Sequence, residues 1–103
     1  MNGYPRLYIG RAAQELKMKC PFPINQIYKD TLSEFISYYI TVHTMAFPLV
    51  IEDIAILNQE QQSELLKFVE DSPLKIILLS KSQVLSDNCF VKNSIYNELS
   101  YTN

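Results

Sequence analysis

The chain has 103 residues, 48% hydrophobic and 19% charged, which is the composition of one globular domain and excludes a disordered or fibrous protein. A net charge of −2 supplies no basic field, so we expect no direct contact with nucleic acid. No apolar stretch approaches the roughly 20 residues that span a bilayer, and we expect no membrane segment. Cys20 and Cys89 lack CxxC spacing and follow no signal peptide, which predicts reduced thiols in the cytoplasm.

The N-terminal third predicts two strands joined by a helix. Residues 6–10, RLYIG, are typical of a short strand that ends at a glycine. Residues 11–19, RAAQELKMK, form helices readily and carry small apolar residues on one side. After a connector that contains two prolines, residues 24–28, INQIY, predict a second, weaker strand.

A second helix is expected in the middle of the chain. Thr31, with Glu34 three residues later, matches the capping-box pattern for a helix start. Apolar residues then recur at helical spacing. Pro48 disfavours the helical conformation in the residue before it, so the helix is expected to end near Phe47.

Two fully apolar strands flank a third predicted helix. Residues 48–53, PLVIED, and residues 74–80, LKIILLS, each contain a continuous apolar run, as strands covered on both faces must. Between them, Asn58 with Gln61 three residues later predicts the start of a helix, and the Ser-Pro pair at 72–73 ends it.

Alternation of short apolar runs with amphipathic stretches predicts the fold class. It is typical of βαβ units that build a mostly parallel sheet with helices on both faces, a small three-layer α/β/α domain. We expect residues 1–103 to form this single domain. Residues 82–99 are compatible with a short helix or an edge strand, and both alternatives stay open.

The segment from the third strand onward resembles a known family. An apolar strand, the acids Glu52 and Asp53, a helix reading EQQSELLKFVED, a Ser-Pro pair and a second apolar strand, KIILLS, follow one another. This order resembles the AAA+ ATPase domain of clamp-loader subunits, particularly the delta-prime type, over about residues 24–85. The resemblance implies a pared-down AAA+ core with Glu52 and Asp53 as Walker-B-like acids. Three residues stand where the family senses the terminal phosphate: Ser80, Lys81 and Ser82.

The chain departs from this family where nucleotide chemistry is done. After residues 6–10 it runs directly into RAAQELK, with no glycine-rich GxxxxGK[ST] loop to surround phosphates, and Arg11 is at most a lone cation there. The family carries Asp before Glu, whereas here Glu52 precedes Asp53. Lys92 is the nearest match to an arginine that reaches a neighbouring nucleotide, and lysine lacks the bidentate fork. We therefore expect no enzyme activity, no cofactor and no bound metal.

Other interpretations of these residues stay open. In one of them, Glu52 and Asp53 end a buried strand and begin a polar turn in which Asp53 caps nearby N–H groups. His43, the single histidine, has no nucleophile at a predictable distance and is expected to be half-buried. Tyrosine gives wide contact at low entropy cost, and seven are present. Candidate interface residues are Tyr38, Tyr39, Gln62, Tyr96 and Tyr101.

These observations predict a catalytically inactive, clamp-loader-like protein of DNA replication. We expect it to contact replication or AAA+ proteins, as an assembly subunit or as an inhibitor, and an oligomer stays open. The residue bias suggests a phage or another compact AT-rich genome, and thus the host cytoplasm. One alternative is a minimal Mg-ATP-binding enzyme or switch in which Glu52 and Asp53 work with a partner chain. Another alternative is a structural protein of a particle.

Overall fold

The protein is built around one parallel five-stranded sheet, seen in a computed structural model that describes residues 6–81 and 101–102. The strands occur in the order β2-β3-β4-β1-β5, and every pairing between neighbours is parallel. Their bounds are β1 Arg6–Gly10, β2 Ile24–Gln26, β3 Leu49–Glu52, β4 Ile76–Ser80 and β5 Tyr101–Thr102. The α-helices are α1 Arg11–Lys19, α2 Leu32–Tyr39 and α3 Gln59–Asp71, and the short 3-10 helices are η1 Lys29–Thr31 and η2 Ile54–Ile56.

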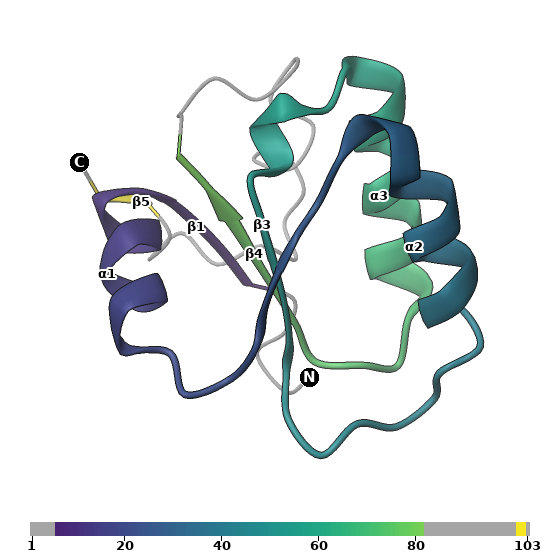
Figure 1. The fold of residues 1–103 in the computed structure, drawn as a ribbon, viewed down its shortest axis with the longest axis horizontal. Helices are drawn as coiled ribbons and strands as arrows, with labels where there is room; N and C mark the ends of the chain where they lie inside the picture. Colours follow the sequence, from purple (N-terminus) through teal and green to yellow (C-terminus); the bar gives the residue numbers. More distant parts are fainter. Residues whose placement is uncertain (1–5, 82–100, 103) are drawn as a thin grey trace.

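Helices cover both faces of this sheet. Figure 1 shows α1 on one side and α2 with α3 on the other. Because side chains alternate along a strand, each central strand supplies both layers. In β3, Ile51 packs into the cluster under α2 and α3, whereas Val50 packs into the cluster under α1. The predicted fold class, a small α/β/α domain with a parallel sheet, is confirmed.

The helix α2 begins directly after Thr31, as predicted, but without the expected capping box. The Thr31 side chain makes no capping hydrogen bond, and Thr31 instead ends the 3-10 helix η1, where its N–H donates to the Tyr28 carbonyl. The chain thus enters α2 from another helical turn, and no free N-terminus is left for the expected capping box of Thr31 and Glu34.

The end of α2 also differs, because the helix stops at Tyr39 and not near Phe47. The N–H groups of Thr41 and Val42 donate to carbonyls three residues back, those of Tyr38 and Tyr39, so the last turn tightens. The Thr41 hydroxyl also donates to the Tyr38 carbonyl over 2.8 Å. Side-chain bonding of this kind competes with helix continuation, and β-branched residues favour the helix little.

The start of α3 follows the prediction. The Asn58 side chain accepts from the Gln61 N–H over 2.8 Å, and the Gln61 side chain accepts from the Asn58 N–H over 3.2 Å. These reciprocal bonds form a capping box. The Gln61 amide also donates to the Lys29 carbonyl, which ties η1 to the first turn of α3.

Parts of the predictions lie outside the described residues. These include the segment 82–99, left open between helix and strand, and with it Ser82, Cys89, Lys92 and Tyr96. Cys20 is a free, half-buried cysteine. Among the helices of residues 6–81, none combines the length and the apolar character needed to cross a membrane.

Candidate functional site

A hollow of about 470 Å³ lies at the carboxyl ends of β1, β3 and β4. The chain leaves β1 through α1 toward β2 on one side, whereas β5 lies on the other side of β1. Ligands of open α/β sheets bind where the connections diverge in this way, outside the carboxyl ends of the strands. The lining residues are Gly10, Arg11, Ala13, Gln14, Lys17, Glu52, Asp53, Leu79, Ser80 and Lys81.

The direct junction of β1 and α1, at Gly10 and Arg11, lines part of this hollow. The strand ends at Gly10 and the helix begins at Arg11, with no residue between them. Gly10 has φ 66° and ψ −124°, a conformation that glycine adopts freely and a Cβ atom would strain. Gly10 offers no side-chain cap to the first turn of α1. The chain therefore passes from strand to helix in one residue, without a loop that could surround a phosphate.

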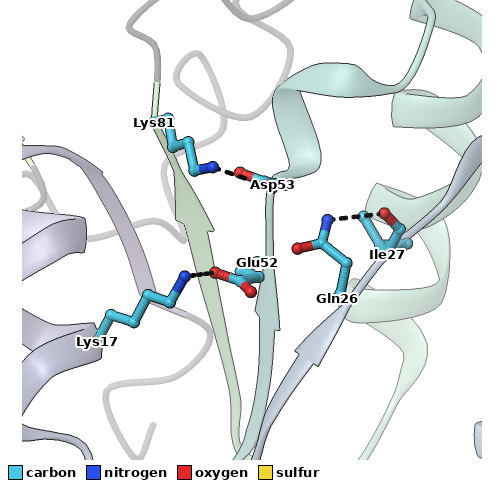
Figure 2. A network of polar contacts seen from close by, with 6 residues as sticks. All are labelled: Lys17, Gln26, Ile27, Glu52, Asp53 and Lys81. Atoms are coloured by element: carbon cyan, nitrogen blue, oxygen red, sulfur yellow. Dashed lines mark hydrogen bonds and ion pairs between the residues drawn. The ribbon is translucent and has the colours of Figure 1, made fainter.

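Glu52, the last residue of β3, is held by a lysine from α1. The Lys17 Nζ atom lies 2.8 Å from the Glu52 Oε2 atom, and the Glu52 side chain is only 13% exposed. Figure 2 shows the lysine reaching from α1 to the end of β3. The pKa of Lys17 is raised, first by its hydrogen bond to Glu52 and by the charge of that carboxylate, and further by Asp53. A nearly buried acid is thus compensated by a charge-assisted bond within the chain.

Asp53 follows in a left-handed backbone conformation. Its φ of 64° and ψ of 39° are positive, which aspartate tolerates better than most residues. Its side chain makes no cap for η2, contrary to the proposed capping turn. The carboxylate instead lies 3.5 Å from the Lys81 Nζ atom, on the loop side of β4 (Figure 2). This ion pair is longer than that of Lys17, and it should contribute less to stability because Lys81 is 76% exposed.

The ends of neighbouring strands flank the two acids. Gln26 of β2 pairs in register with Glu52, and the Ile27 N–H donates to the Glu52 carbonyl over 3.4 Å. The Gln26 amide donates to the Ile27 carbonyl, beside the acids in Figure 2. On the other side, Ser80 is fully buried at the end of β4 and pairs in register with Ile9. Of the predicted site residues, Glu52, Asp53, Ser80 and Lys81 meet in one hollow.

Three of the candidate interface residues, Tyr38, Tyr39 and Gln62, do not line this hollow. Tyr38 and Tyr39 lie at the end of α2, on the opposite face of the sheet from α1. Gln62 is 1% exposed, and its amide donates to the Leu57 carbonyl over 3.0 Å. It therefore stabilises the turn before α3, and its expected place at an interface is wrong for the folded chain. Tyr101 lies in β5 beside β1, and Tyr96 lies outside the described residues.

Sequence reasoning missed Lys17, which makes the shortest ion pair of the hollow. Arg11, Gln14 and Lys17 recur at a spacing of three and line the hollow together. This spacing places residues on one helix face. A helix that directly follows a strand begins at the carboxyl edge of the sheet. The polar spacing was therefore a signal that α1 contributes to the site.

The charges of the hollow are arranged to satisfy one another. Arg11, Lys17 and Lys81 face Glu52 and Asp53, and each acid already has a lysine within ion-pair distance. In the region that the structure covers, no three His, Cys, Asp or Glu side chains are grouped so that they could hold a metal ion. Lys17 and Lys81 thus lie at ion-pair distance from the two acids, and β1 passes into α1 without an intervening loop.

Comparisons with protein-family models, with curated proteins and with solved structures found no match to this chain.

Proposed function

We propose that this protein is a catalytically silent relative of clamp-loader ATPase domains that acts by protein–protein contact in DNA replication. The observation that carries the proposal is the direct junction of Gly10 and Arg11, at the position where the family has its phosphate-binding loop. Walker-B-like acids are retained at the end of β3, and a polar strand end is retained in β4. We therefore expect a domain of this kind to act by binding other proteins through its surface and not by catalysis.

The ion pairs of the two acids support the absence of hydrolysis. By the resemblance, Glu52 would take the metal-binding role, and Lys17 lies 2.8 Å from its carboxylate. Asp53 would take the water-orienting role, yet it is one methylene shorter than glutamate and lies near Lys81. A metal ion would have to displace one lysine, and an incoming phosphate would find no backbone cradle. We propose that the chain is not an enzyme and needs no cofactor.

Two modes of action share this basis. In the first, the protein joins a replication assembly as a structural subunit, as the delta-prime type does. In the second, it imitates one AAA+ subunit and blocks the partner site of another. Both place the protein in the cytoplasm, the host cytoplasm if a phage encodes it, next to replication ATPases.

Calorimetry with Mg-ATP and Mg-ADP tests the catalytic half of the proposal. We expect no heat of binding up to millimolar nucleotide for the wild type or for Glu52→Gln/Asp53→Asn. Saturable heat that the double variant loses would overturn the proposal. It would support the alternative, a nucleotide switch whose phosphate contacts come from a partner chain.

One observation favours that alternative enough to keep it in the test. The hollow brings three cations, two acids and the uncapped N-terminus of α1 together at a switch point of the sheet. A Lys17→Met variant sharpens the measurement, because it frees the Glu52 carboxylate without removing either acid. Binding of nucleotide by this variant alone would show that Lys17 blocks an otherwise competent site.

Copurification tests the contact half of the proposal. The tagged protein should retain clamp-loader or other AAA+ subunits from purified replication proteins of its source. Retention should not require nucleotide, since the chain itself is not expected to bind any. Self-assembly into large particles with no affinity for replication proteins would favour the structural-protein alternative instead.

A further inference from the structure

A second hollow, of about 380 Å³, lies between α2 and α3, on the face of the sheet opposite α1. We call it the α2–α3 groove. Its apolar lining comes from Ile36, Tyr39 and Ile40 at the end of α2, and from Phe68 and Pro73 at the end of α3. Figure 1 shows the two helices side by side on this face of the sheet.

Large apolar side chains remain exposed at one end of this groove. Ile40 lines it and is 62% exposed, and Tyr38, in ring contact with Tyr39, is 64% exposed. The Tyr38 and Tyr39 rings meet edge to face at 4.8 Å, and the Phe35 and Tyr39 rings lie 4.7 Å apart. Ring packing of this kind restricts the aromatic side chains before a partner arrives, which lowers the entropy cost of binding.

The charges around the groove are mostly negative. The elements η1, α2 and α3 carry six acidic and two basic side chains, whereas α1 carries three basic and one acidic. Glu64 and Asp71 line the groove from α3, with Lys67 between them. Within residues 6–81, neither Glu64 nor Asp71 takes part in an ion pair, in contrast to Glu52 and Asp53.

We propose that the α2–α3 groove binds an amphipathic helix of a partner protein, with its apolar side chains in the groove and its Lys or Arg side chains at Glu64 and Asp71. Helices recognised in grooves present apolar anchors at spacings of three and four residues. The negative field selects a basic helix and speeds its encounter. This inference rests on the proposed function for its biological setting and names the surface through which the contact would be made.

Charge also argues against a second copy of the chain as the occupant. A symmetric dimer through this groove would place the same patch of each copy at the interface. In that patch Glu64 and Asp71 outnumber Lys67, so acidic groups would be in excess across the interface, and an excess of like charge is unfavourable. A partner helix with basic flanks satisfies both acids and needs only a neutral or acidic residue opposite Lys67.

The experiment uses the full chain and two designed peptides of 18 residues. Both peptides carry the same leucines at helical spacing, one with lysine flanks and one with glutamate flanks. Fluorescence anisotropy measures their affinities, and amide chemical shifts locate the binding site. We expect the lysine peptide to bind at least about tenfold more tightly than the glutamate peptide, with shifts at Ile36, Tyr39 and Phe68.

Two variants test the residues that carry the proposal, and a third serves as the control. We expect Ile40→Ser to weaken the lysine peptide about tenfold or more, through lost apolar contact. Glu64→Gln/Asp71→Asn should remove most of the preference for lysine over glutamate flanks while keeping the leucine contribution. The matched control is Met18→Ser, because Met18 is 81% exposed on α1 and far from the groove in the fold. All three changes lie on accessible side chains, and unchanged thermal unfolding verifies that each variant folds.

The proposal would be overturned by equal affinity for the two peptides, by shifts confined to α1, or by no binding at millimolar peptide. A dimer in sedimentation equilibrium that Ile40→Ser dissociates would also overturn it, in favour of a second copy as the occupant. Failure of the proposed function is distinguishable. Replication proteins retained equally by wild type and by Ile40→Ser would reject the groove alone, whereas peptide binding without any replication partner would reject only the proposed setting.

Discussion

The Lys17 Nζ atom lies 2.8 Å from the Glu52 Oε2 atom, and this pair joins the helix that follows the first strand to the carboxyl end of the third. The contact spans the layer between α1 and the sheet. A carboxylate at that strand end needs a cation, and here the chain supplies one itself. An acid that resembles a metal ligand in sequence is, in the fold, one half of an internal ion pair.

This pair predicts a specific loss of stability at alkaline pH. The folded chain raises the pKa of Lys17 above its unfolded value of about 10.4. The stabilising contribution is therefore fully present below that value and is lost as pH rises through the folded pKa. Denaturant unfolding between about pH 8 and 11.5 should show a steeper fall in the free energy of unfolding for the wild type than for Lys17→Met.

Lys19→Met provides the control for this measurement, since Lys19 belongs to the same helix and undergoes the same chemical change. Its pH dependence should follow the wild type, because the Lys17 to Glu52 pair remains. If Lys17→Met and Lys19→Met gave the same alkaline profile, the ion pair would contribute nothing measurable in solution.

The backbone of Asp53 predicts an unusual order of two substitutions. Asp53→Ala and Asp53→Gly both remove the carboxylate that faces Lys81, so they differ only in the Cβ atom. At φ 64° that atom costs about 1 to 2 kcal/mol. Thermal and denaturant unfolding should therefore show Asp53→Gly to be more stable than Asp53→Ala, by about 1 kcal/mol after the backbone entropy of glycine is considered.

The neighbouring residue reverses this order and serves as the control. Glu52 lies in the extended strand β3, where glycine weakens pairing relative to alanine. Glu52→Ala should thus be more stable than Glu52→Gly. If the alanine variant were more stable than the glycine variant at both positions, the left-handed conformation of Asp53 would not persist in solution.

The sequence predicted the fold where local pattern and burial agree. Continuous apolar runs predicted β3 and β4, and in the structure all five residues of β4 are buried. The Asn58 and Gln61 pattern predicted the start of α3 because its hydrogen bonds are local. The end of α2 was missed, since the bonds of Thr41 to a carbonyl three residues back compete with a helical pattern that continues in sequence.

The site was predictable in its acids and not in its cations. Glu52 and Asp53 end an apolar strand, and a parallel sheet brings such ends to one edge. The ion-pair partner of Glu52 depends on where α1 lies relative to β3. That position is set by the pairing of β1 with β4 and of β4 with β3, which involves residues distant in sequence. Gln62 was misplaced for a similar reason. Gln62 is buried because its amide bonds to the Leu57 carbonyl in the turn before α3, and the course of that turn cannot be predicted from the periodicity of α3.

Gln62 gives a prediction about the core. Gln62→Leu replaces the polar side chain by an apolar one of similar size and leaves the Leu57 carbonyl without its amide donor. A buried group that loses its partner costs about 1 to 3 kcal/mol, so denaturant unfolding should show a loss in that range. Ser63→Ala, at the next and exposed position of α3, should change stability by less than about 0.5 kcal/mol. A Gln62→Leu variant as stable as the wild type would contradict the importance of this bond.

Removing the side chains of the two capping signatures, Asn58 and Thr31, should change the free energy of unfolding by different amounts. Asn58→Ala deletes an oxygen that accepts the Gln61 N–H, and loss of such a cap costs about 0.5 to 2 kcal/mol. Thr31→Ala deletes a hydroxyl that makes no capping bond, so its effect should stay within about 0.5 kcal/mol. Urea unfolding of both variants measures the difference. Asn58→Asp retains the acceptor and should keep most of the stability that Asn58→Ala loses. Equal losses for Asn58→Ala and Thr31→Ala would mean that the sequence pattern, and not the observed hydrogen bonds, identifies the working caps.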